Sequence, residues 1–235
     1  VALNKGTGEV ISGQGIIPEG FQHYILKYDD NSAYPYAKLE YVYYRMALDA
    51  GIEMMPSELR TYDGVTHFLT QRFDREGNEK IHTQTLAAML PTSDSYEDIF
   101  SVIRRLNLPY EDSRQHFLRM VFNVTTRNVD DHSKNFSFCM NKKGIWRLSP
   151  AYDLTYSVDL TAPAYSNRHS LTINGKNEDI TREDLGTVGQ NNDIQDYNAL
   201  IDTVYNAVAK FESHARELRI DEKLIKSIQE DFIKV

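Results

Sequence analysis

The sequence predicts an α+β fold of two lobes, a small strand-rich lobe over residues 1–74 and a larger helical lobe over residues 75–235. Short segments of strand-type composition, separated by glycine-rich turns, fill the first lobe. Beyond residue 75 the apolar residues recur at the three- and four-residue spacing of amphipathic helices. The chain can bury a core, because 41% of its 235 residues are hydrophobic and 26% are charged, near the globular average.

Strand-type segments dominate the first lobe. There are five of them: residues 1–4, 9–12, 21–28, 54–62 and 65–73. The first three surround glycine-rich turns and predict a small antiparallel sheet. Pro56 interrupts the fourth, and Asp63-Gly64, a dipeptide favoured in hairpin turns, joins the fourth to the fifth.

One helix is expected in the first lobe, over residues 35–50. Its apolar side chains fall at helical spacing. Asn31 or Ser32 can cap its start, Pro35 suits the first turn, and Gly51 is expected to end it. This helix follows the third strand directly along the chain.

The second lobe is expected to be mainly helical. Ser93 or Asp94 can cap one of its helices and Asp112 another. A hairpin is expected to interrupt the helices across a turn at residues 141–144, and the tail over residues 193–235 reads as two amphipathic helices. The other expected elements are helices over residues 81–90, 96–106 and 113–127, and hairpin strands over residues 136–140 and 145–148.

Charge and composition exclude several classes of function. Asp and Glu (34 residues) outnumber Lys and Arg (26 residues), so the net charge is −8, which argues against a basic polyphosphate-binding protein. No apolar segment reaches the roughly 20 residues that a membrane-spanning helix needs, and the start lacks a secretory signal. The single cysteine, Cys139, cannot form an internal disulfide and is expected to pack in a strand. We therefore expect a cytoplasmic protein without a membrane partner.

A dense polar stretch, residues 127–135, lies between the third helix and the hairpin. It contains Asp130 and, five residues later, Asn135. A further carboxylate, Asp153, follows 18 residues after Asn135, and the intervening hairpin can return the chain so that Asp153 lies beside Asn135. For an isolated polar stretch, a capped helix end and a turn would be the ordinary explanation.

These three residues have the types and spacing that phosphoryl transfer requires. The reaction needs a carboxylate that accepts the proton of an attacking hydroxyl, and hard oxygen ligands that hold Mg²⁺ against the phosphates of ATP. The catalytic loop of protein kinases places its Asp five residues before its Asn, with a metal-binding Asp later, so Asp130, Asn135 and Asp153 match it in order. Lys134 could face the transferred phosphate or be solvated, and His132 is expected to support the loop. The pattern predicts a two-lobed protein-kinase-like fold.

A kinase also needs a cation from the first lobe on the nucleotide phosphates, and Lys27 at the end of the third strand offers one. Glu40 lies in the middle of the following helix and could pair with Lys27, as the strand lysine and helix glutamate of kinases do. A surface glutamate is the alternative.

Several motifs together resemble the HipA family of serine/threonine kinases, the toxin halves of bacterial toxin–antitoxin pairs. The matching segments are residues 130–135 (DDHSKN), 151–154 (AYDL), 38–40 (KLE), 47–52 (ALDAGI) and 72–75 (RFDR). The resemblance implies that Asp130 is the catalytic aspartate, that Asn135 and Asp153 bind Mg²⁺, and that Lys27 contacts the ATP phosphates. It also implies that Gln71 and Phe73 belong to the hinge against which adenine lies.

The resemblance extends to partners. It implies phosphorylation of a cytoplasmic protein, in studied members of the family an aminoacyl-tRNA synthetase, and binding of a small DNA-binding antitoxin. The acidic net charge agrees with leaving direct contact with nucleic acid to that antitoxin.

Two features depart from the family pattern. A serine-containing, glycine-rich phosphate loop should precede the strand lysine, but residues 12–15 (SGQG) lie too close to Lys27 and read as a hairpin turn, so the first lobe is expected to be truncated upstream. Leu154-Thr155 follows Asp153 where protein kinases have Phe-Gly. The alternatives are a phosphoinositide-type or small-molecule kinase, because Asp130, His132 and Asn135 also satisfy an Asp-x-His-x-x-Asn loop, or a non-catalytic binding module.

Overall fold

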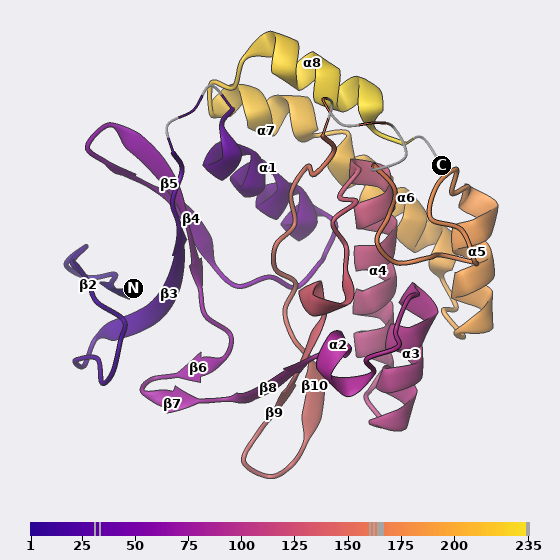
Figure 1. Ribbon diagram of the computed structural model, residues 1–235, viewed down its shortest axis with the longest axis horizontal. Coiled ribbons are helices and arrows are strands. Elements are labelled where there is room, and N and C mark those ends of the chain that lie inside the picture. The colour runs from indigo at the N-terminus through magenta and orange to yellow at the C-terminus, as the bar shows by residue number, and fades with distance from the viewer. Residues whose placement is uncertain (31, 33, 160, 162, 164–166, 234–235) are drawn as a thin grey trace.

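The computed structural model describes residues 1–30, 32, 34–159, 161, 163 and 167–233, and these form a small strand-rich lobe and a larger helical lobe (Figure 1). The small lobe holds a five-stranded sheet in the order β2-β1-β3-β5-β4, in which every neighbouring pair is antiparallel. Its strands are β1 (Ala2–Asn4), β2 (Val10–Ile11), β3 (Phe21–Lys27), β4 (Ser57–Tyr62) and β5 (Val65–Gln71). The predicted sheet and the β4–β5 hairpin are confirmed.

The register of the two central strands determines what the sheet presents to the other lobe. Lys27 pairs with Phe68 and Ile25 pairs with Thr70. Directly paired residues of antiparallel strands lie on the same face, so these four side chains share one face of the sheet. All four line a single cavity described below.

The connection over residues 12–20 differs from the prediction. Ser12 and Gln14 form only a local turn, in which the Gln14 backbone N–H donates to Ser12 Oγ (3.3 Å). Because β1 lies between β2 and β3 in the sheet, this segment crosses over from one strand to a non-neighbouring one. The expected hairpin turn at residues 12–15 is therefore wrong; the hairpin joins β1 to β2.

Helix α1 (Tyr36–Asp49) lies between the sheet and the helical lobe (Figure 1). Pro35 occupies the cap position rather than the first turn, and the backbone N–H of Ala37 in the first turn donates to Asp29 Oδ2 (3.1 Å). The expected cap by Ser32 is therefore wrong, and Asn31 lies outside the described residues. Gly51 follows the helix with a φ of 75°, the left-handed conformation that glycine adopts without strain.

The larger lobe combines helices with a three-stranded sheet, β10-β9-β8, which lies at the lower edge of Figure 1, and the small β6–β7 hairpin leads into this sheet. Its strands are β6 (Arg75–Glu76), β7 (Glu79–Lys80), β8 (His82–Thr85), β9 (Ser137–Met140) and β10 (Trp146–Leu148). Its helices are α2 (Leu86–Met89), α3 (Tyr96–Arg105), α4 (Tyr110–Thr126), the short 3₁₀ helix η1 (Ser133–Asn135), α5 (Arg182–Asn191), α6 (Tyr197–Val208), α7 (Phe211–Glu217) and α8 (Glu222–Asp231). The predicted hairpin and the cysteine-bearing strand are confirmed.

Three predictions for this lobe are corrected. The helix expected over residues 81–90 is strand β8 followed by one helical turn, because β8 pairs with β9. Helix α3 is capped by Ser95, and α4 begins after Pro109 without a side-chain cap. The tail forms three helices instead of two, and α5 was not predicted at all, since two of its ten residues are glycines.

One large core unites the helical lobe with α1. Met46 of α1 is fully buried in the same cluster as Phe122 of α4 and Phe211 of α7, whereas Leu3, Tyr24 and Leu69 of the sheet form a separate small cluster. The boundary near residue 74 stays a prediction, since α1 precedes it in the chain and packs beyond it. Within the described residues, no helix is long and apolar enough to cross a membrane.

Candidate active site

Lys27 lies between two carboxylates where the lobes meet. Its Nζ is 2.6 Å from Glu40 Oε1 on α1 and also forms an ion pair with Asp153. Burial alone would lower the pKa of Lys27, but the two carboxylates outweigh that cost and raise it above its usual value. Burial raises the pKa of Glu40 to about 7, although the ammonium partly opposes this. The predicted Lys27–Glu40 pair is confirmed, and Lys27 remains a cation at neutral pH.

Asp153 reaches Lys27 because the chain after β10 joins the linker between α1 and β4. The Ala151 backbone N–H donates to the Glu53 carbonyl (2.7 Å), and Ala151 forms a parallel bridge with Met54. Asp153 has a φ of 59°, a left-handed conformation that Asp adopts more readily than most residues. Its side chain remains 44% exposed, so one side of the carboxylate faces solvent.

The polar stretch after α4 forms a loop whose course is set by backbone conformation and by hydrogen bonds to its backbone. Arg127 ends the helix in the left-handed conformation, with a φ of 58°. Asp130 then projects outward with 66% of its side chain exposed. Asn135 Nδ2 donates to the Asp130 backbone oxygen (2.8 Å), which leaves the amide oxygen of Asn135 available to another group. His132 Nε2 is 3.8 Å from Asp130 Oδ1, too far for a hydrogen bond, so the supporting role of His132 stays a prediction.

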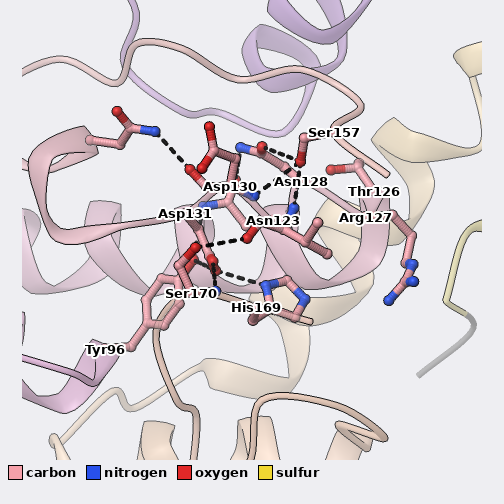
Figure 2. A network of polar contacts seen from close by, with 12 residues as sticks. Tyr96, Asn123, Thr126, Arg127, Asn128, Asp130, Asp131, Ser157, His169 and Ser170 are labelled. Carbon is pink, nitrogen blue, oxygen red and sulfur yellow. Dashed lines mark hydrogen bonds and ion pairs between the residues drawn. The ribbon is translucent and has the colours of Figure 1, made fainter. Parts of the chain in front are cut away.

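Ser157 holds the backbone of this loop from the segment that follows Asp153 (Figure 2). Its Oγ accepts hydrogen bonds from the backbone N–H groups of Val129 (2.7 Å) and Asp130 (3.0 Å) and donates to Asn128 Oδ1 (3.3 Å). The hydroxyl thus uses its donor and both acceptor positions on the loop. Sequence reasoning missed Ser157, because a serine 27 residues after Asp130 carries no local signal.

Asp131, the neighbour of Asp130, is directed into the protein (Figure 2). Its carboxylate is fully buried and lies at hydrogen-bonding distance from Tyr96 Oη (2.6 Å), His169 Nδ1 (2.7 Å) and the Ser170 backbone nitrogen (2.7 Å). Sequence reasoning did not assign a role to Asp131 or His169. The adjacent Asp-Asp pair was visible, but the partners lie 35 to 39 residues away along the chain.

A cavity of about 350 Å³ opens beside Lys27, and its lining is mostly apolar. Gln71 and Phe73 border it, together with Glu40 and Asp153, so the structure brings both predicted hinge residues to the same space as Lys27 and one of the two predicted metal ligands, Asp153. The Phe73 ring packs against Tyr152 with 5.4 Å between ring centroids. An apolar cavity with a few charged groups at one end is typical of nucleotide pockets.

A second cavity, of about 10 Å³, lies between the loop that carries Asn135 and the segment that carries Asp153. Asn135 and Asp153 both border it, which supports the expectation that the hairpin returns Asp153 to the neighbourhood of Asn135. Arg119, which is buried, also borders it, and burial lowers the pKa of this guanidinium to about 10. The buried Arg119 guanidinium therefore borders the same cavity as the Asp153 carboxylate.

Lys134 is the predicted site residue that the structure does not bring to the others. Its side chain is exposed. Its backbone carbonyl accepts a hydrogen bond from Tyr152 Oη (2.8 Å). A larger hollow, of about 1130 Å³, lies between the β6–β7 and β9–β10 hairpins and includes none of the predicted carboxylates. We therefore locate the candidate site in the smaller cavity beside Lys27.

The comparison with known families agrees with this geometry. A model of the HipA-like C-terminal domain matches residues 3–232. The chain belongs to this family. The protein named "Putative kinase Y4mE" from Sinorhizobium fredii (strain NBRC 101917 / NGR234) is 28% identical over 130 residues, which cover 48% of this chain and 31% of that protein.

Solved structures confirm the predicted two-lobed kinase-like fold. HipA of the Shewanella oneidensis MR-1 toxin–antitoxin system, solved with HipB and its operator DNA, superposes with a TM-score of 0.69 at 18% identity over 88% of this chain and 56% of that one. The Helicobacter pylori proinflammatory kinase CtkA superposes with a TM-score of 0.52 at 12% identity over 89% of this chain and 90% of that one. This member of the HipA-like family thus spans about half of HipA and about a third of Y4mE.

Proposed function

We propose that this HipA-like domain is a protein kinase that transfers the γ-phosphoryl group of ATP to a serine or threonine hydroxyl. One observation carries the proposal: Lys27, held between Glu40 and Asp153, lies at the edge of an apolar cavity. A cation fixed by a helix glutamate is the group that protein kinases direct at nucleotide phosphates. Family membership supports the same reaction class.

The cavity suits the nucleotide in both shape and chemistry. Adenine would enter between the apolar lining and the hinge formed by Gln71 and Phe73, with the phosphates extending toward Lys27. Lys134, which is exposed next to Asn135, is free to swing toward the outermost phosphate, and we assign it the weakest role of the proposed ligands. Rings such as Phe73 and Tyr152 can pack against the flat base.

Asp153 and Asn135 fit the requirements of Mg²⁺. Both offer hard oxygen atoms, both border the small cavity, and the amide of Asn135 is already turned so that its nitrogen is used by Asp130. Mg²⁺ usually takes one or two carboxylate or amide oxygens from the protein and completes its coordination with phosphate and water, so two protein ligands suffice for the proposed site. When bound, the ion would neutralise charge on the ATP phosphates.

Asp130 is suited to orient the acceptor, because its carboxylate is exposed while its backbone is held by Ser157 and Asn135. The hydroxyl oxygen of the substrate would bond to the γ-phosphorus as the bond to ADP breaks, and Asp130 would accept the hydroxyl proton. Transfer of charge to the departing ADP would be balanced by Lys27.

Asp130→Asn tests the proposal. It should abolish phosphoryl transfer, because the amide cannot accept the proton, while leaving ATP affinity unchanged, since Asp130 does not border the nucleotide cavity. Transfer is measured with labelled ATP, and binding by the nucleotide-dependent rise in melting temperature. A kinase should gain about 2–3 kcal/mol of stability at ligand near 100 times its dissociation constant. Transfer at the wild-type rate would overturn the role of Asp130, and the absence of any nucleotide effect would favour a non-catalytic module.

The partners belong to the same proposal. HipA of Shewanella oneidensis was solved with HipB and operator DNA, and we propose that this protein binds a similar DNA-binding antitoxin, acts in the cytoplasm, and makes no direct contact with nucleic acid itself. Its net charge of −8 supports leaving the DNA to the partner. An aminoacyl-tRNA synthetase is the proposed substrate. Phosphoproteomics of cells that express the wild type or Asp130→Asn would identify the phosphorylated protein.

A further inference from the structure

Asp130 and Asp131 are adjacent in the chain but have opposite environments. The Asp130 side chain is 66% exposed, whereas the Asp131 side chain is fully buried. Adjacent residues share one planar peptide unit, so fixing the side chain of one residue limits the directions that its neighbour can take. The buried carboxylate is therefore placed to determine where Asp130 points.

We infer that Asp131 is a positioning residue, which holds Asp130 in its reactive direction by tying the loop over residues 128–131 to the segment over residues 167–173. The inference rests on the proposed function of Asp130. Its partners Tyr96, His169 and Ser170 come from the start of α3 and from that later segment.

The network around Asp131 is almost saturated. Tyr96 Oη donates to Asp131 Oδ2 and accepts from Asn123 Nδ2 (2.9 Å), and Asn123 Oδ1 in turn accepts from Asn128 Nδ2 (3.0 Å), which lies in the loop itself (Figure 2). A buried carboxylate is costly unless such bonds compensate it, and bonds to a charged acceptor are the strong ones. The network consequently favours one arrangement of the loop.

The later segment is itself anchored, so it can serve as a fixed support. Ser170 Oγ donates to the Val129 carbonyl (3.2 Å). Thr172 N–H donates to the Asp94 carbonyl (2.8 Å), and Tyr96 N–H donates to the Thr172 carbonyl (3.0 Å). The segment is thus joined to the loop on one side and to the start of α3 on the other.

The replacement Asp131→Asn is expected to disturb this arrangement without changing its size. The carboxylate can accept from Tyr96, His169 and Ser170 at once, whereas an amide has only one accepting oxygen. The donating nitrogen of the amide would face either the Ser170 N–H or the Tyr96 and His169 donors. Tyr96 cannot reverse its hydroxyl readily, because that oxygen already accepts from Asn123.

The test compares Asp131→Asn with Asp49→Asn in the full chain. Asp49 is a matched control, since its carboxylate lies 2.9 Å from His214 Nε2 in a second Asp–His pair that joins α1 to α7, away from the loop. We expect Asp131→Asn to lower kcat about 10- to 100-fold, the cost of slight misplacement of a reacting group, with KM for ATP within about twofold of the wild type. Asp49→Asn should leave kcat within about twofold.

Two further measurements keep the result decisive. Tyr96→Phe removes a single bond to Asp131, so a smaller loss of kcat is expected even if Asp131→Asn folds poorly. Amide hydrogen exchange at Val129 and Asp130, which donate to Ser157, should accelerate in Asp131→Asn and not in Asp49→Asn, and this readout does not depend on catalysis. Unchanged exchange together with unchanged kcat, or equal losses in the control, would overturn the inference. If the wild-type protein shows no kinase activity but exchange is still accelerated in Asp131→Asn, the proposed function is refuted and the positioning of the loop by Asp131 is not.

Discussion

Individual residues of the site are held by charge rather than by close packing. Lys27 contacts Glu40 and Asp153, and of these two partners Asp153 is the more exposed, with 44% of its side chain accessible against 12% for Glu40. An exposed carboxylate is cheaper to reorient than a buried one, because water screens the change. We therefore expect Asp153 to be the partner that exchanges Lys27 for metal and phosphate when nucleotide binds.

Asp153→Ala tests that expectation. It should weaken Mg²⁺-dependent ATP binding about 10-fold or more, because one of two protein oxygens proposed for the ion is lost. Calorimetric titration with ATP, with and without Mg²⁺, measures the effect. Asp202→Ala is the control, as it removes the α6 carboxylate from an exposed ion pair with Arg182 of α5. Equal affinity in both variants under both conditions would show that Asp153 does not bind the metal.

For individual residues, the sequence predicted the site residues that are recognised by their spacing, and it missed those that reach the site only when the chain folds. Asp130, Asn135 and Asp153 were recognisable because kinase chemistry requires those residue types in that order. Ser157 and His169 were not, because their importance comes from contacts with a loop 27 and more residues away. A lone serine or histidine carries no pattern that reveals such a contact.

Among the secondary-structure elements, long periodic helices were predictable and short ones were not. Helices α1, α3 and α4 were expected. The buried residues of α1 and α3 form one face of each helix, whereas α4 is buried on all sides over residues 115–126. Strand β8 was expected to be helical because the apolar residues over residues 81–90 recur at helical spacing. Pairing with β9, which lies more than 50 residues later, determined its structure.

Ser95→Ala should destabilise the protein by about 1 kcal/mol, within the range of 0.5–2 kcal/mol typical of lost helix caps. Ser95 Oγ accepts from the Asp98 backbone N–H, and the Asp98 carboxylate accepts from the Ser95 backbone N–H, so the substitution breaks a reciprocal capping box at the start of α3. Urea denaturation measures the change. Ser93→Ala is the matched control, because the buried Ser93 Oγ has no hydrogen-bond partner in the structure. A larger loss of unfolding free energy for Ser93→Ala than for Ser95→Ala would show that Ser95 does not cap α3.

For the molecule as a whole, the sequence predicted two lobes but not how they share a core. The strand lobe has only a small cluster of its own around Leu3, Tyr24 and Leu69. Its one helix, α1, packs into the large cluster with α4, α6 and α7, and Figure 1 shows α1 between the sheet and those helices. Periodicity identified the buried face of α1 correctly, but it cannot say which partner covers that face.

This shared core makes a prediction about cooperativity. Met46→Ala, in the middle of α1, should lower the free energy of unfolding by about 2–5 kcal/mol, the usual cost of emptying a buried methionine site. Trp146, the single tryptophan, lies on β10 in the other lobe and packs against the large cluster, so its fluorescence reports on that lobe. If both lobes unfold as one unit, the fluorescence and far-ultraviolet circular dichroism midpoints should shift together. An unshifted fluorescence midpoint would show that the lobes unfold separately and that α1 does not couple them. Tyr62→Ala, on the exposed end of β4, is the control and should shift neither midpoint appreciably.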